Sequence, residues 1–143
     1  MLARIFVVAV AVNYPWEFAQ SPLYAQPGGW RARVWHCGLA SAGDGVMILL
    51  IVFTGRLLLR RGDWFVRPDT RGYVIMLAAG LALGIGVEWA AVQGLGWWSY
   101  ASRMPLVPAL GIGITPVAQL LALPPRIARL AAMRSIRARA VRR

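Results

Sequence analysis

Long apolar runs recur along this chain, and they restrict its possible folds more than any other feature of the sequence. Three of them, 36–59, 73–95 and 106–123, are long and apolar enough to cross a hydrocarbon core of roughly 30 Å, which takes about 20 helical residues. A share of 59% hydrophobic residues and a mean hydropathy of +0.58 exceed what a soluble domain of 143 residues can bury. We therefore expect a membrane protein in which these three runs are spanning helices.

The N-terminal segment 2–24 is a fourth and less regular candidate. Only 5–12 is uniformly apolar, and the block that follows, NYPWEFAQSPLY, contains two prolines and a glutamate. No small-x-small site of the kind that ends a signal peptide follows the apolar run, so we interpret the segment as an uncleaved, proline-kinked helix. The predicted fold class is all-α: a bundle of four transmembrane helices over residues 1–125, followed by a basic tail at 126–143.

The sixteen basic residues are all arginine, and their placement predicts an orientation. With four crossings, the N-terminus, the 60–72 connection and the C-terminus share one side and carry thirteen arginines, against Arg31, Arg33 and Arg103 on the other. Positive charge favours the cytoplasmic side, so both termini are expected there. The arginine-rich, Ala-, Gly- and Val-rich composition suggests a bacterium, and hence its inner membrane. The expected partners are anionic lipid headgroups, above all at the tail, and not nucleic acid.

Four ionisable side chains interrupt the apolar segments: Glu17, Asp44, Glu88 and, at an outer mouth, His36. An ionised carboxylate in hydrocarbon costs several kcal/mol, so it is retained only where it is paired, hydrated or used. With a rise of about 1.5 Å per residue, these groups and Gln119 of the last run fall at overlapping depths in the outer half of the bundle. They form the candidate site.

The spacing of small residues indicates which way Glu88 faces. Gly80, Gly84 and Glu88 recur every four residues on one stripe, and small residues at that spacing let another helix approach closely. Glu88 is therefore expected to point into the bundle. His36 and Asp44 are eight residues apart and can face one pocket, although the helix turns by about 80° between them.

Several blocks carry a resemblance to known families. NYPWEFAQSPLY at 13–24, WHCGLASAGDG at 35–45, Val-Glu-Trp at 87–89 and Met-Pro at 104–105 together resemble a group of small four-helix bacterial membrane proteins. This resemblance covers most of the chain and implies a membrane location. Trp-Glu-Phe at 16–18 is in turn similar to the Trp-Glu start of the membrane-bound terpene cyclases of fungal meroterpenoid pathways, which implies that Glu17 acts as an acid.

A further resemblance involves the second half of the chain. Glu88, GWWSY at 96–100 and GITPVAQ at 113–119 are similar to the acidic residue, Trp-x-Tyr and Pro-x-Glu-Glu arrangement of the heterodimer-type lycopene cyclases. The chain departs from that pattern at one important point. Ala118 and Gln119 occupy the two acidic positions, so a proton donor of that kind cannot be placed there.

The leading hypothesis is an integral membrane enzyme, a cyclase or isomerase, that acts on an isoprenoid or similar lipid. Glu17 or Glu88 is kept protonated by burial and donates a proton to an alkene or epoxide, while the other carboxylate or Asp44 accepts one. Aromatic faces stabilise the developing carbocation. The expected substrate-binding residues are His36, Trp16, Trp89, Trp97, Tyr100 and Gln119.

Other functions remain open. In a non-catalytic accessory subunit or small-molecule binding module, the carboxyl groups would hydrogen-bond Tyr, Trp or backbone groups and fix the packing. A proton-coupled transporter would have to oligomerise, because four short helices enclose little volume. A homo-oligomer or a membrane partner is compatible with either class. A cavity of ~300 Å³ or more beside the carboxylates would favour the enzyme.

No metal or cofactor is predicted. Two Glu, one Asp and one His could in principle bind a divalent ion, but no HxxxH, ExxH or CxxC spacing supports such a site. The single cysteine, Cys37, excludes an intrachain disulfide. Nucleotide-binding and serine-hydrolase motifs are also missing from the sequence.

The predicted orientation can be tested with reporter fusions placed after Arg143 and within 97–104. We expect a cytoplasmic signal from the first and a periplasmic signal from the second, because an arginine at the centre of a spanning helix costs about 2.5–3.5 kcal/mol. A periplasmic C-terminus would contradict the orientation and the depths derived from it.

Overall fold

The structure, a computed structural model, describes residues 1–25 and 28–140, with side chains as far as residue 133. Its elements are α1 (Leu2–Gln20), a 3₁₀ turn η1 (Ser21–Leu23), α2 (Trp30–Leu59), α3 (Thr70–Trp89), a π-helical turn η2 (Ala90–Gly94), β1 (Leu106–Val107), β2 (Ile112–Gly113) and α4 (Ile114–Ala140). The expected all-α bundle of four helices is confirmed.

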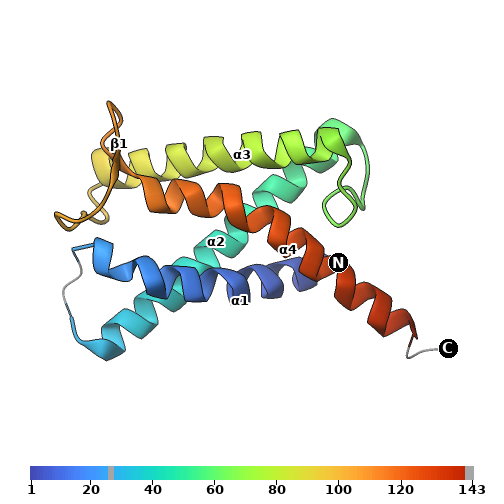
Figure 1. Cartoon of the computed structure of the whole chain (residues 1–143), viewed down its shortest axis with the longest axis horizontal. Coiled ribbons are helices and arrows are strands. Elements are labelled where there is room, and N and C mark those ends of the chain that lie inside the picture. Colours follow the sequence, from blue (N-terminus) through green and yellow to red (C-terminus); the bar gives the residue numbers. More distant parts are fainter. Residues whose placement is uncertain (26–27, 141–143) are drawn as a thin grey trace.

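Each of the four helices packs against two others. α1 packs against α2 and α4, and α3 packs against the same two helices. Figure 1 shows the start of α1 and the connection between α2 and α3 at one end of the bundle, with the α1–α2 connection and the β1–β2 hairpin at the other. The α1–α2 connection and the segment between α3 and α4 therefore lie at the same end of the bundle, as the predicted chain path requires.

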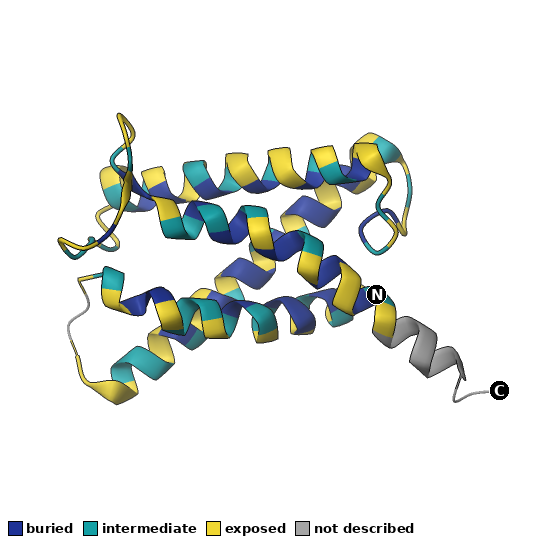
Figure 2. Cartoon of the chain, viewed as in Figure 1, coloured by how far each residue is buried: buried dark blue, intermediate teal, exposed yellow. Residues whose placement is uncertain are grey.

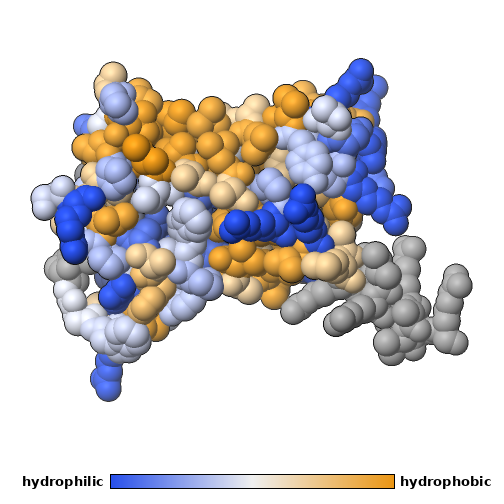
Figure 3. Space-filling view, viewed as in Figure 1, coloured by the Kyte–Doolittle hydropathy of each residue, from blue (hydrophilic) through white to orange (hydrophobic). Residues whose placement is uncertain are grey.

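In the described part of the chain, three helical segments are long and apolar enough to cross a membrane: Leu2–Leu23, Trp30–Leu59 and Thr70–Gly94. Large apolar side chains of α2 and α3 are exposed, among them Leu39, Leu57, Leu58 and Val74. Figure 3 shows a broad apolar surface over α3. These features are those of a membrane protein.

The fourth predicted span, 106–123, is wrong over its first eight residues. Leu106 pairs with Gly113 in the β1–β2 hairpin, and α4 begins only at Ile114. Pro108 has no N–H to donate, and Gly111 has a φ of +64° that closes the turn. α4 itself is not among the helices apolar enough to span, because Gln119, two prolines and two arginines dilute its apolar residues.

α4 also continues through residues 125 and 126, where the bundle was expected to give way to the tail. Pro124 and Pro125 lie inside the helix, and Ile127, Ala128 and Ala131 are buried in the same core as Ile5 and Ile48. In Figure 2 the buried residues of all four helices face the interior. The packed bundle therefore extends at least to Ala131.

The connection between α2 and α3 folds back on the bundle. Trp64 is fully buried, and its indole nitrogen Nε1 donates to the Val52 carbonyl at 2.9 Å. A Cβ at Gly55 would overlap the Trp64 ring, so glycine is required where the ring lies against α2. Asp69 then caps α3 by accepting a hydrogen bond from the Gly72 amide at 2.8 Å.

The glycine stripe of α3 lies against α4, as its spacing predicted. A Cβ at Gly80 would overlap the Leu120 carbonyl oxygen, and one at Gly84 would lie 3.3 Å from the Val117 Cα. Glu88, one turn further along, is buried. The expectation that Glu88 points into the bundle is confirmed.

Gly80→Ala should therefore destabilise the protein, because α3 and α4 would have to separate to admit one methyl group. We expect a loss of about 1–3 kcal/mol in the free energy of unfolding, seen as a lower unfolding temperature in detergent. Gly86→Ala is the matched control on α3, since nothing lies within 4 Å of a Cβ there. Equal unfolding temperatures for the two variants would contradict the close contact.

Candidate functional site

A network of side chains centred on Gln119 joins α1, α2 and α4. The Gln119 Nε2 donates to Asp44 Oδ2 and to Asn13 Oδ1, both at 2.8 Å, and its Oε1 accepts from Gln20 Nε2 at 2.9 Å. The Gln20 Nε2 also donates to Glu17 Oε1 at 2.7 Å. Both hydrogens of each amide nitrogen are thus used, and each amide has one defined orientation.

Asn13 and Gln20 are site residues that the sequence reasoning missed. Asn13, Glu17 and Gln20 recur at four- and three-residue spacing, which places them on one face of α1. Asn13 is fully buried and donates its own N–H to the Ala9 carbonyl at 2.9 Å. This polar face within an apolar segment was a signal that could have identified both residues.

Glu17 on α1 and Asp44 on α2 are linked through two amides, since Gln20 Nε2 donates to Glu17 and Gln119 Nε2 donates to Asp44. Among the described residues, the only acidic groups in ion pairs are Asp63 and Asp69, both with Arg61 at the far end of the bundle. In the described part of the chain, Glu17 and Asp44 therefore have amide donors and no neutralising arginine.

Glu88 lies in a second cluster and accepts three hydrogen bonds. Its Oε1 accepts from the Tyr24 hydroxyl at 3.1 Å, and its Oε2 accepts from Trp98 Nε1 at 3.1 Å and from the Tyr100 hydroxyl at 2.6 Å. The Tyr100 oxygen accepts in turn from the Gly113 amide at 2.8 Å, so its own hydrogen is directed at Glu88. This arrangement suits a carboxylate that acts as an acceptor.

The two tyrosines of this cluster remain neutral donors. Burial raises the pKa of Tyr24 and of Tyr100, and the neighbouring Glu88 raises both further. Tyr24 and Tyr100 are joined by a β-bridge, flanked by a 2.9 Å hydrogen bond from the Ala25 amide to the Ser99 carbonyl. The donors to Glu88 thus come from two segments that the backbone ties together.

Both clusters border one cavity of about 1120 Å³. Its polar lining comprises Glu17, Gln20, Ser21, Tyr24, His36, Cys37, Asp44, Glu88, Trp97, Trp98, Ser99 and Gln119. All three predicted catalytic carboxyl groups are brought together at this cavity, which is several times the ~300 Å³ that a small ligand needs. Mutual hydrogen bonds do not close them off from it.

The cavity opens sideways through the bundle. Of its lining residues, Leu39, Gly43 and Val46 on α2 and Val87 on α3 are exposed. Apolar exposed residues at a mouth between two span-length helices face the hydrocarbon of a membrane. The cavity is therefore open on an apolar side of the bundle.

The aromatic and polar residues predicted to bind substrate are only partly gathered here. His36 and Trp97 line the cavity. Tyr100 does not line it, but its hydroxyl donates to Glu88, which does. Trp16 instead packs against the core and donates to Gln20 Oε1 at 3.2 Å. Trp89 is half exposed and does not line the cavity.

Tyr24 and Trp98 were not predicted as site residues. Trp98 follows Trp97 directly, with ring centroids 6.4 Å apart, but Trp98 is the one that donates to Glu88. Tyr24 lies 64 residues from Glu88 in the sequence. No local sequence pattern predicts a contact between residues so far apart in the chain.

Within the described residues, no group of three or more His, Cys, Asp and Glu side chains could hold a metal ion. No known protein family, curated protein or solved structure matches the chain. The chemistry of the site therefore has to be argued from its own geometry.

Replacing Gln119 tests the network directly. Gln119→Leu should lower the free energy of unfolding by about 1–3 kcal/mol, because the buried Asp44, Asn13 and Gln20 each lose a partner. The matched control is Gln93→Leu, since Gln93 is exposed and makes only a 3.4 Å contact to the Gly111 carbonyl. Chemical unfolding in detergent measures both, and an unaffected Gln119→Leu protein would rule out the network as a stabilising element.

Proposed function

We propose that this chain is an enzyme of the bacterial inner membrane, with cytoplasmic termini, that isomerises or cyclises an isoprenoid or comparable lipid by acid–base catalysis. Its arginine-rich end is proposed to contact anionic headgroups. The observation that carries the proposal is the Glu17–Asp44 pair, in which two acids linked through Gln20 and Gln119 both line a cavity of about 1120 Å³. In this proposal the two acids share one proton, beside a space that is large enough for a lipid chain.

In the proposed reaction the pair gives up one proton and later takes another back. The pair donates it to one carbon of a substrate alkene, so the π electrons form a C–H bond and the neighbouring carbon becomes a cation. A second alkene can attack the cation and close a ring. The substrate then loses a proton to the pair, which has become more basic, and a new alkene forms. The product is an isomer of the substrate, and the pair returns to its starting state.

Glu88 has a different proposed role. Because its oxygens already accept three hydrogen bonds, it is suited to hold negative charge near the cation and less suited to donate a proton. Trp97 and Trp98 at the cavity wall would add the attraction of their π faces. Trp16 and Trp89, which lie elsewhere, have no part in this proposal.

A non-catalytic membrane module is the second candidate. It is favoured by the complete use of the Gln119 and Gln20 amide hydrogens, which lock three helices together as a packing device would. In that case the cavity would bind a lipid or another small apolar molecule without changing it. The two candidates differ in whether the proton of the pair is needed.

Glu17→Gln and Asp44→Asn separate the candidates, because an amide keeps the shape and most hydrogen bonds but cannot donate a carboxylic proton. We expect both variants to fold and to lose the lipid conversion seen with wild type, measured by mass spectrometry of lipid extracts from a host carrying the native pathway. Asp63→Asn is the control, since Asp63 is an exposed acid far from the cavity.

Two results would count against the enzyme. Wild-type lipid profiles with both amide variants would exclude the pair as the acid. A profile that does not differ between wild type and a host without the protein would favour the binding module, especially if an unaltered lipid co-purifies with the chain.

A further inference from the structure

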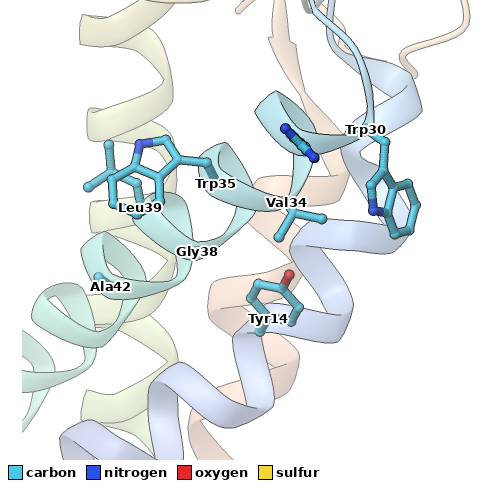
Figure 4. A pocket seen from close by; sticks show the side chains of 8 residues that line it. Tyr14, Trp30, Val34, Trp35, Gly38, Leu39 and Ala42 are labelled. Carbon is cyan, nitrogen blue, oxygen red and sulfur yellow. The ribbon is translucent and has the colours of Figure 1, made fainter.

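A second hollow lies on the outside of the bundle, where the start of α2 crosses α1. It has a volume of about 530 Å³ and is lined by Tyr14, Trp30, Arg31, Val34, Trp35, Gly38, Leu39 and Ala42. Figure 4 shows Tyr14 on α1 facing Val34 on α2, with Trp30 and Trp35 beyond them on either side. The hollow plays no part in the proposed reaction.

The lining residues of α2 form one stripe with a charged end. Arg31 lies in the first turn, and the stripe continues through Val34, Gly38 and Ala42 at three- and four-residue spacing. At about 1.5 Å per residue, the apolar part from Val34 to Ala42 runs about 12 Å along the helix. A cationic group at the end of an apolar groove complements an anionic phospholipid headgroup followed by its acyl chain.

Arg31 is available to bind an anion, in contrast to its neighbour Arg33. The Arg33 guanidinium donates to the Ser21 hydroxyl at 2.6 Å and to the Phe18 carbonyl at 2.9 Å, and its Cζ lies 4.4 Å from the centre of the Phe18 ring. Arg31 is exposed and makes no hydrogen bond or ion pair with the described residues. It is thus the positive charge of this groove that the protein leaves unmatched.

Two further features suit a membrane lipid. Trp30 and Trp35 are 66% and 74% exposed on either side of the groove, as expected of rings at the headgroup level. The Tyr14 hydroxyl faces the groove and has no hydrogen-bond partner among the described residues, so it can donate to an ester or phosphate oxygen. Each polar part of the groove therefore complements the headgroup region of a lipid.

We infer that this groove is a binding site for an anionic phospholipid, with the phosphate on Arg31 and one acyl chain along Val34, Gly38 and Ala42. The site is independent of the proposed reaction. Leu39 and Ala42 border both the groove and the cavity, whereas Arg31 and Gly38 border the groove alone. Changes at the latter two positions therefore probe only the lipid site.

The test uses the purified full-length chain and phosphatidylglycerol with a photoactivatable diazirine in one acyl chain. Illumination should label the tryptic peptide 34–56, identified by mass spectrometry. Unlabelled phosphatidylglycerol should compete about five-fold better than phosphatidylcholine, the preference that one surface arginine provides. Reading the label at this peptide separates the groove from the basic residues of α4.

Two pairs of variants decide the outcome. Arg31→Gln should abolish the five-fold preference, whereas Arg103→Gln, at an exposed arginine of the same end, should keep it. Gly38→Leu should abolish the labelling by filling the groove, since a Cβ there meets nothing nearer than the Tyr14 ring at 4.0 Å. Gly86→Leu, in open space on α3, should leave the labelling intact.

Three results would overturn the inference: equal competition by the two lipids in wild type, a preference that survives Arg31→Gln or falls equally with Arg103→Gln, or labelling that survives Gly38→Leu. Arg31 is exposed, so its variant should fold. This keeps the test decisive even if Gly38→Leu proves unstable.

Discussion

Carboxyl groups buried in an apolar bundle must be supplied with hydrogen bonds, and this requirement organises the whole molecule. Moving a carboxylate out of water without a partner costs far more than any single packing contact returns. The buried Asp44 and Glu88 and the half-buried Glu17 meet the requirement with amides, phenols and an indole instead of arginines. The arginines are thereby left for the ends of the molecule and the surface.

The two ways in which the acids are satisfied have different structural consequences. Gln119 bonds to α1 and α2 from α4, so the relative positions of three helices depend on one amide. Glu88 instead holds the C-terminal end of α3 to Tyr24 and Tyr100, whose backbone segments pair with each other. One network joins α1, α2 and α4, and the other joins the end of α3 to the connecting segments beside it.

The sequence predicted three of the four helices over most of their length, and it predicted which site residues lie at the same depth. Both depend on properties summed over many residues, namely hydropathy and helical rise. About 20 apolar residues specify a spanning helix whatever their order, and a constant helical rise places Glu17, Asp44 and Gln119 at one depth. Hydropathy failed at 106–113 because it ignores the backbone, where Pro108 and the positive φ at Gly111 favour a hairpin.

The partners of Glu88 were out of reach for another reason. Tyr24 and Trp98 lie beside Glu88 because the backbone at Tyr24 pairs with the backbone at Tyr100. Neither short segment has a local pattern that predicts this pairing. Asn13 and Gln20, by contrast, were within reach of the sequence, because helical spacing alone puts them beside Glu17. Long-range contacts between loops are thus the part of this site that requires a structure.

The sideways mouth between α2 and α3 determines how any ligand of the large cavity would be delivered. Exposed Leu39, Val46 and Val87 border that mouth, so a ligand that enters there would come from the hydrocarbon of the bilayer. Occupancy would then follow the mole fraction of the ligand within the bilayer, and the aqueous concentration would not enter. Diluting the protein with detergent at constant total ligand would empty the cavity as surely as removing the ligand.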